Sequence, residues 1–220
     1  MSNKISDFKN LIEQELLYKV QLTSEHDFEP IKVDNVPKQW KCMGAGNYAA
    51  VFLHSDYQEW VVKVYGRNVR GLKKEVSVYQ QLGSHPAYSE LMGYGDKYVI
   101  LKRLKGITLY DAVHKGKRIP PSVIKDINKA LDYARTQGLN PYDVHGKNVM
   151  MKDGRGYVVD ISDFYKEGSD KKWGDLVTAY YKVYKHTLYK FPIKIPFFIL
   201  DLVRYGYRIY KSLKEQVRKK

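Results

Sequence analysis

Apolar residues recur along the chain with two different spacings, and these spacings predict helices and strands. Between residues 5 and 20, Ile5, Phe8, Ile12 and Leu16 lie three or four positions apart, which predicts an amphipathic helix. Short apolar runs bounded by turn residues predict β-strands, at 40–43, 50–54, 60–65, 98–101, 149–151 and 157–159. Helical spacing returns at 72–82, at 119–138 and from Trp173 onward. We find no internal repeat.

This order predicts the fold class. Most of the predicted strands lie in the first half and most of the helices in the second, which is typical of an α+β protein with two lobes. We place an antiparallel-sheet N-lobe at residues 1–104, with its N-terminal helix, and a reduced, mostly helical C-lobe at residues 105–220.

Composition narrows the class of protein. The 220 residues carry 38 Lys and Arg against 24 Asp and Glu, a formal net charge of +14, which favours an anionic partner. The single cysteine, Cys42, excludes an intramolecular disulfide framework. No secretory signal and no spanning apolar run is visible, so we expect a soluble, cytoplasmic protein.

A glycine-containing segment follows the first central strand. Gly44, Ala45, Gly46 and Asn47 lead into a second strand that includes Val51. Glycines in a strand–turn–strand segment let the backbone approach phosphates closely, although such a segment also occurs in ordinary hairpins. Ala49 stands where a third glycine would complete GxGxxG, and no helix follows directly, which counts against a Rossmann dinucleotide site.

Lys63 lies inside the apolar strand at 60–65. An ammonium there must reach solvent or an anion, because an unpaired buried charge is costly. It is either an edge lysine or a ligand of nucleotide α- and β-phosphates paired with a helix carboxylate. Glu75 in the helix at 72–82 is the favoured partner, since Glu59 lies in the turn before the strand.

The strongest signal is Asp143, followed five residues later by Asn148 and then by a short strand. Asp160 ends the next strand. Phosphoryl transfer needs a carboxylate that orients the acceptor hydroxyl and hard oxygen ligands for Mg²⁺, and these three residues supply both in order.

Together these motifs resemble those of the protein-kinase-like superfamily, over roughly residues 41–185. The resemblance, closest to compact bacterial serine/threonine kinases, implies a two-lobed kinase fold that binds ATP and Mg²⁺. It further implies that Leu101 is the gatekeeper, that Lys102 to Leu104 line the adenine site, and that Asp175 braces the catalytic loop.

The chain also departs from typical kinases. Pro141 and Tyr142 replace the usual His-Arg before Asp143, so the arginine that docks an activation-loop phosphate is missing. His145 stands where typical serine/threonine kinases have lysine, whereas small-molecule phosphotransferases and some atypical kinases have histidine at this position. We expect His145 to contact phosphate or shape the site. Only twelve residues separate Asp160 from Trp173, which leaves little room for an activation segment. We therefore expect constitutive competence or control by a partner.

The C-terminal segment is strongly basic, with eleven Lys and Arg against two acidic residues between positions 182 and 220. From Ile199 its apolar residues follow helical spacing. We favour a helix that completes the core of the C-lobe and exposes a basic face. Contact with an anionic membrane or an acidic protein is the alternative, and nucleic acid is the least favoured partner.

We interpret the chain as an ATP- and Mg²⁺-dependent phosphotransferase, and favour a serine/threonine protein kinase with an unidentified protein substrate. Asp143, Lys63, Glu75 and His145 are the candidate catalytic residues, and Asn148 and Asp160 the candidate metal ligands. Two alternatives stay open. One is a kinase for a small molecule such as a sugar, lipid or aminoglycoside, and the other is a non-catalytic nucleotide-binding scaffold.

Overall fold

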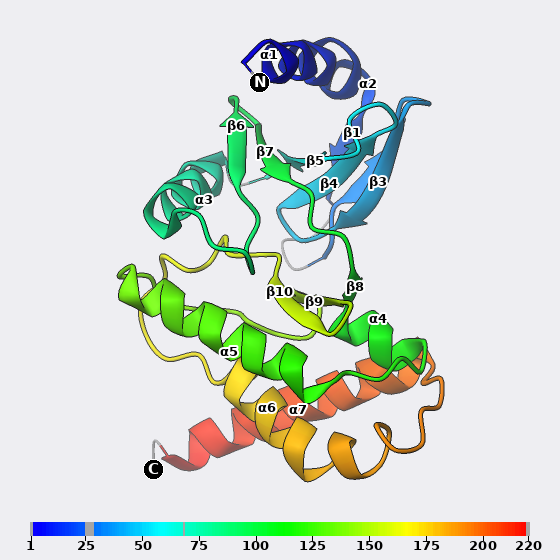
Figure 1. Cartoon of the computed structure of the whole chain (residues 1–220), viewed down its shortest axis with the longest axis vertical. Coiled ribbons are helices and arrows are strands. Elements are labelled where there is room, and N and C mark those ends of the chain that lie inside the picture. Colours follow the sequence, from blue (N-terminus) through cyan, green and yellow to red (C-terminus); the bar gives the residue numbers. More distant parts are fainter. Residues whose placement is uncertain (1, 25–28, 68, 219–220) are drawn as a thin grey trace.

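A five-stranded antiparallel sheet forms the centre of the N-terminal half (Figure 1). The computed structural model describes residues 2–24, 29–67 and 69–218. In spatial order the strands are β3 (Trp40–Ala45), β4 (Ala49–His54), β5 (Trp60–Tyr65), β7 (Tyr98–Lys102) and β6 (Leu91–Tyr94). Helix α3 (Val69–Leu82) connects β5 to β6. The α+β class and the antiparallel N-terminal sheet are confirmed.

An N-terminal helix covers one face of this sheet. It runs through α1 (Ser2–Leu11), a π-helical turn η1 (Ile12–Leu16) and α2 (Leu17–Lys19), and so agrees with the helix predicted at 5–20. Its buried Phe8, Ile12 and Leu16 pack against Trp60 and Val62 of the sheet. Two short strands, β1 (Gln21–Thr23) and β2 (Lys32–Asp34), pair with each other and were not predicted.

Successive side chains of β5 point to opposite faces of the sheet, and the two faces have different surroundings. Trp60, Val62 and Val64 pack in the core under the N-terminal helix. Because side chains alternate along a strand, Lys63 and Tyr65 point to the opposite face, toward α3 and the C-terminal half. One face of the sheet therefore packs under the N-terminal helix, and the other packs toward α3 and the C-terminal half and also carries the charge of Lys63.

The C-terminal half is mainly helical and contains one small sheet. Strand β8 (Ile107–Thr108) pairs with β9 (Val149–Lys152), which pairs with β10 (Arg155–Val158). The helices are α4 (Leu109–His114), α5 (Pro121–Thr136), α6 (Lys172–Lys182) and α7 (Phe197–Arg218), with a 3₁₀ turn η2 (Tyr184–His186) after α6. The division at residues 104 and 105 stays a prediction.

Helix α5 fixes the position of β10, and thereby of the segment that follows it. Pro121 stands at the first turn of the helix, where a missing N–H costs nothing, and Gly138 after its end adopts a φ of +74°. A Cβ added to Gly156 of β10 would lie 2.4 Å from the carbonyl oxygen of Val123, so only glycine allows this approach. Asp160 follows two residues after β10 and is held in place by this packing.

The structure corrects the favoured interpretation of the C-terminal segment. Helix α7 forms as its spacing predicts, but in the part of it whose side chains the structure describes, the apolar residues do not complete the core. The apolar positions from Tyr210 onward lie outside that part. Large apolar side chains of the first four turns of α7 are exposed, namely Phe197, Phe198, Ile199, Leu202, Val203, Tyr205 and Ile209. Spacing establishes that a helix has an apolar face, but it does not establish which way that face points.

We predict that Phe8→Ala lowers the free energy of unfolding by about 3–5 kcal/mol. Phe8 is fully buried, and its ring centroid lies 4.6 Å from that of Tyr57 and 5.4 Å from that of Trp60. Urea denaturation measures the change. Tyr18→Ala, in the same helix but 83% exposed, is the control and should change stability by no more than about 0.5 kcal/mol. Equal stabilities of the two variants would contradict the packing of the N-terminal helix on the sheet.

Candidate active site

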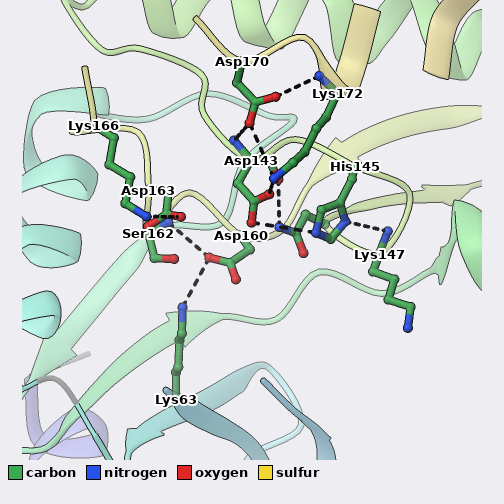
Figure 2. A network of polar contacts seen from close by, with 11 residues as sticks. Lys63, Asp143, His145, Lys147, Asp160, Ser162, Asp163, Lys166, Asp170 and Lys172 are labelled. Carbon is green, nitrogen blue, oxygen red and sulfur yellow. Dashed lines mark hydrogen bonds and ion pairs between the residues drawn. The ribbon is translucent and has the colours of Figure 1, made fainter. Parts of the chain in front are cut away.

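Lys63 links both halves of the molecule through two ion pairs. Its Nζ lies 3.0 Å from Oε1 of Glu75 on α3 and 3.3 Å from Oδ1 of Asp160, beyond β10. Figure 2 shows Lys63 extending toward Asp160. The Lys63 and Glu75 side chains are 13% and 1% exposed, whereas Asp160 keeps 37% of its side chain exposed. Three residues from separate parts of the sequence therefore form one charge cluster.

The charges in this cluster shift one another's pKa. Burial opposes the charged form of Lys63, but the carboxylates of Asp160 and Glu75 outweigh it and raise the pKa of Lys63 well above its usual value. Burial raises the pKa of Asp160, yet the Lys63 ammonium and the Ser162 N–H outweigh burial and lower it. For Glu75, burial dominates over Lys63 and raises the pKa.

Glu75 has a second partner that the sequence analysis missed. The hydroxyl of Tyr65, two residues after Lys63 on the same face of β5, donates a hydrogen bond to Oε2 of Glu75. Lys63 contacts the other oxygen, so both oxygens of this buried carboxylate are satisfied. The signal was available in the two-residue spacing of Lys63 and Tyr65 along a strand.

The connection between α5 and β9 forms a compact loop around Asp143. The backbone of Asp143 has a φ of +59°, which is uncommon for a residue other than glycine. The Asn148 side-chain amide donates to the Asp143 carbonyl oxygen at 3.1 Å, and the Asn148 N–H donates to the His145 carbonyl oxygen at 2.8 Å. The loop is therefore closed by its own hydrogen bonds.

His145 faces Asp143, and its contacts favour the neutral ring. Its Nδ1 accepts a hydrogen bond from the Lys147 N–H at 3.2 Å, so the neutral ring carries its proton on Nε2. That nitrogen lies 3.8 Å from Oδ2 of Asp143. Burial, together with the charges of Lys172 and Arg204, outweighs the attraction of Asp143 and lowers the pKa of His145.

The residue that braces this loop is Asp170, and the expectation for Asp175 is wrong. Oδ2 of Asp170 accepts the Asp143 N–H and Oδ1 accepts the Lys172 N–H, both at 2.8 Å. Asp175 instead accepts a hydrogen bond from the hydroxyl of Tyr207 on α7, at 2.5 Å. Asp170 precedes the first turn of α6 and points back at the loop, whereas Asp175 lies inside the helix and points away.

Lys172 is a further residue that the sequence analysis missed. Its Nζ pairs with Oδ1 of Asp143 and lies 3.7 Å from Oδ2 of Asp170 (Figure 2). Burial opposes its charge, but these two carboxylates outweigh burial and raise the pKa of Lys172. The cation beside Asp143 thus comes from the start of α6, and His145 occupies the loop position where kinases usually have lysine.

The glycine-containing segment lies in the β3–β4 hairpin. Gly44 pairs in register with Val51, and Val51 pairs with Lys63, so these three residues lie in a row across one face of the sheet. Ala45 pairs with Ala50, and the Gly46 N–H donates to the Ala49 carbonyl oxygen at 2.9 Å, which closes the turn around Asn47. The structure brings Gly44 and Val51 onto the face that carries Lys63.

The segment expected to line the adenine site lies at and beyond the end of β7. Leu101 is buried, Leu104 is half-buried, and Lys102 is exposed with its Nζ 2.7 Å from Glu90. The Lys102 carbonyl oxygen accepts a hydrogen bond from the Ser89 hydroxyl at 2.6 Å. A carbonyl oxygen has two lone pairs, so it can accept a second bond. The side chain of Lys102 points away from the buried side of the strand.

Asp163, which precedes Phe164, lies three residues after Asp160 but has a different partner. It pairs with Lys166 at 2.7 Å, while Asp160 reaches Lys63. Among the described residues there is no group of three His, Cys, Asp or Glu side chains placed to hold a metal ion. Any metal here would depend on Asp160, the amide oxygen of Asn148 and a bound ligand.

We predict that Asp170→Ala lowers the free energy of unfolding by about 1–3 kcal/mol, because the half-buried N–H groups of Asp143 and Lys172 lose their buried acceptor. The amide hydrogen of Asp143 should also exchange faster with solvent. Asp175→Ala is the matched control and should change stability by about 0.5 kcal/mol or less, since it loses one exposed contact. Denaturant unfolding and hydrogen exchange measure both effects, and equal behaviour of the two variants would overturn the assignment of Asp170.

Comparison with known proteins supports a kinase-like identity. No protein-family model matches the chain. Two eukaryotic kinases match a shorter part of it, each 26% identical over 44% of this chain. They are the serine/threonine-protein kinase KSP1 of Saccharomyces cerevisiae, of which 10% is covered, and the ribosomal protein S6 kinase alpha-6 of Danio rerio, of which 14% is covered.

A bacterial relative matches far more of the chain. The Bacillus subtilis protein named "Putative serine/threonine-protein kinase YrzF" is 31% identical over 180 residues, which are 80% of this chain and 83% of that protein. The similarity extends over most of both chains, so the protein belongs to the same family as this serine/threonine-kinase-like protein.

Proposed function

We propose that the protein is an ATP- and Mg²⁺-dependent phosphotransferase that phosphorylates serine or threonine residues of a protein. The observation that carries the proposal is the position of Lys63 Nζ between Glu75 and Asp160, next to the loop that presents Asp143 and Asn148. The names of the relatives support the same class of activity.

The charges of the cluster fit a nucleotide with a divalent cation. One ammonium, that of Lys63, faces two carboxylates, so an excess negative charge remains on the more exposed one, Asp160. Asp160 and the amide oxygen of Asn148 are hard oxygen donors of the kind that Mg²⁺ prefers. We propose that these two residues hold the cation and that Lys63, positioned by Glu75, binds the α- and β-phosphates.

The glycines of the hairpin fit a nucleotide as well. A Cβ added to Gly44 would meet no atom within 4 Å, and one added to Gly46 would meet only the Ala49 carbonyl oxygen at 3.8 Å. Neither glycine has a positive φ. Packing and backbone strain within the chain therefore do not explain them. Close approach of a phosphate to the backbone, from Gly44 to Val51 and on the Lys63 face, does.

ATP with Mg²⁺ would supply the phosphoryl group and neutralise its charge. The chain's own residues would position the acceptor. Lys172 holds Oδ1 of Asp143, which leaves Oδ2 to orient the acceptor hydroxyl and take its proton. His145, neutral and with its proton on Nε2, can donate a hydrogen bond toward the same position. Leu101 and the backbone of Lys102 to Leu104 would contact the adenine.

We predict that Asp143→Asn lowers the rate of phosphoryl transfer by about 10²–10⁴-fold, the range typical of a positioned general base. Asp160→Ala should abolish transfer, because the Mg²⁺ ligand is lost. The measurement is label transfer from γ-labelled ATP with Mg²⁺, to the protein itself and to a generic basic protein. Asp163→Ala, which changes only the contact with Lys166, is the control and should keep activity.

The outcomes of this assay separate the candidate functions. Labelled protein that disappears in both variants supports a protein kinase. ATP consumption that depends on Asp160, without labelled protein, favours a small-molecule acceptor, to which His145 and the short segment between Asp160 and Trp173 also correspond. ATP binding without consumption by the wild type would overturn the proposal in favour of a nucleotide-binding scaffold.

We also predict that Gly44→Val weakens binding of Mg²⁺-ATP about tenfold or more, which corresponds to about 1.4 kcal/mol. A valine here fills space on the Lys63 face but meets no protein atom, so thermal stability should stay unchanged. Isothermal titration calorimetry measures the affinity. Met43→Val, at the neighbouring exposed position of β3, is the control. Unchanged affinity in Gly44→Val would place the nucleotide elsewhere.

A further inference from the structure

Helix α7 attaches to the C-terminal half through its polar side. The Tyr110 hydroxyl on α4 donates to Asp201 at 2.8 Å, and the Tyr207 hydroxyl donates to Asp175 on α6 at 2.5 Å. At the start of the helix, Phe197 stacks on His114 with ring centroids 3.6 Å apart. In Figure 1 α7 runs along the lower part of the molecule, in the region of α4 and α6.

The opposite side of the helix is an apolar stripe that faces away from the protein. Phe198, Leu202, Tyr205 and Ile209 follow one another at intervals of four, three and four residues, which places them on one face. Each is between 44% and 71% exposed. Leu200, Arg204 and Tyr207, on the other side, are half-buried. The helix therefore has the reverse orientation of an ordinary surface helix, whose apolar face points to the core.

This orientation implies that something covers the stripe. Full burial of one large apolar side chain stabilises by about 1.5–3 kcal/mol, and the stripe forgoes several such contributions. Monomeric soluble proteins rarely expose a large contiguous apolar patch unless it binds something. Ile199 and Val203 flank the stripe and are also exposed, which widens it.

The surrounding charge selects the occupant. Residues 182–220 contain eleven Lys and Arg against two acidic residues, and the whole chain has a net charge of +14. A second copy carries the same charge and would be repelled. Nucleic acid would satisfy the basic residues but leave the aliphatic stripe without a partner. An anionic lipid surface satisfies both, because it offers phosphate groups at its surface and hydrocarbon just below.

We propose that α7 is a reversible anchor that lies flat on anionic lipid membranes. Phe198, Leu202, Tyr205 and Ile209 enter the boundary between headgroups and acyl chains, and exposed lysines of the segment before the helix, such as Lys190 and Lys194, contact the headgroups. Each Lys or Arg near such a surface contributes about 1 kcal/mol, which adds to the apolar term. Among the described residues no helix is long and apolar enough to cross a membrane, so the contact is with the surface.

The experiment is co-sedimentation of the full-length protein with phosphatidylcholine vesicles, with and without phosphatidylserine. The wild type is expected to bind the phosphatidylserine vesicles at least tenfold more tightly than the neutral ones, with affinity that falls as salt rises. A double variant, Phe198→Ser with Leu202→Ser, should bind at least tenfold more weakly. Tyr18→Ser, at a position more exposed than either but on the N-terminal helix, is the control and should bind like the wild type.

Several outcomes would overturn the anchor. One is a wild type that stays in solution with phosphatidylserine vesicles, which would leave an acidic protein as the occupant. Another is equal binding of the double variant, which would reduce the contact to charge alone. A wild type that is dimeric by light scattering, when the double variant is monomeric, would assign the stripe to a second copy. The assay contains no ATP, so its result is independent of the proposed kinase activity.

Discussion

The ammonium of Lys63 is the constraint on which the arrangement of the two halves depends. It lies on a strand whose other face is hydrophobic core, so it cannot move away without breaking that packing. Its two carboxylate partners come from α3 in one half and from the end of β10 in the other. Loss of Glu75 would leave the Lys63 charge without its buried partner, at a cost of about 3–5 kcal/mol, whereas the pair with the partly exposed Asp160 contributes less. The two pairs together hold the helix, the sheet and β10 in mutual register. The same atoms form the candidate phosphate site, so structure and chemistry share one set of contacts.

The loop around Asp143 is stabilised by residues outside the loop as well as by its own hydrogen bonds. Asp170 and Lys172, at the start of α6, bind its backbone and its carboxylate respectively. A positive φ at Asp143 costs free energy, and such a conformation persists only where the surroundings hold it. The start of α6 is therefore part of the site, and the position of that helix determines where Asp143 points. In turn, α6 is linked to α7 through Asp175 and Tyr207, so the proposed anchor and the loop are joined through one helix.

Much of this was predictable from the sequence, and the failures have physical reasons. The central strands and the long helices were found because their periodicity extends over several residues, as was the partnership of Lys63 with Glu75, since a buried ammonium requires an anion. Strands β1, β2, β6 and β8 have only two to four residues each and were missed, because tertiary pairing decides such short strands. The equally short β9 and β10 were found because a turn between them indicates a hairpin. The expectation that Asp175 braces the loop, which came from the kinase resemblance, failed because the sequence does not show which of two acids near Trp173 faces the loop. Only the direction of α6 shows that the one before the helix faces the loop.

Helix α7 shows the same limit most clearly, because its spacing was interpreted correctly and its orientation was not. The spacing of apolar residues shows only that one helix has an apolar face. Whether that face is buried depends on the elements that the helix packs against. Here the polar groups of α7 have specific acceptors and donors on α4 and α6, and an apolar contact with the same surface would leave Asp201 and Tyr207 without theirs. These two hydrogen bonds, together with the stacking of Phe197 on His114, lie on the docked side of the helix, and the stripe faces outward on the other side. An apolar stripe that faces outward within a basic segment is favoured only when a partner covers it. The proposed membrane anchor therefore rests on the docking contacts of α7 as well as on its stripe.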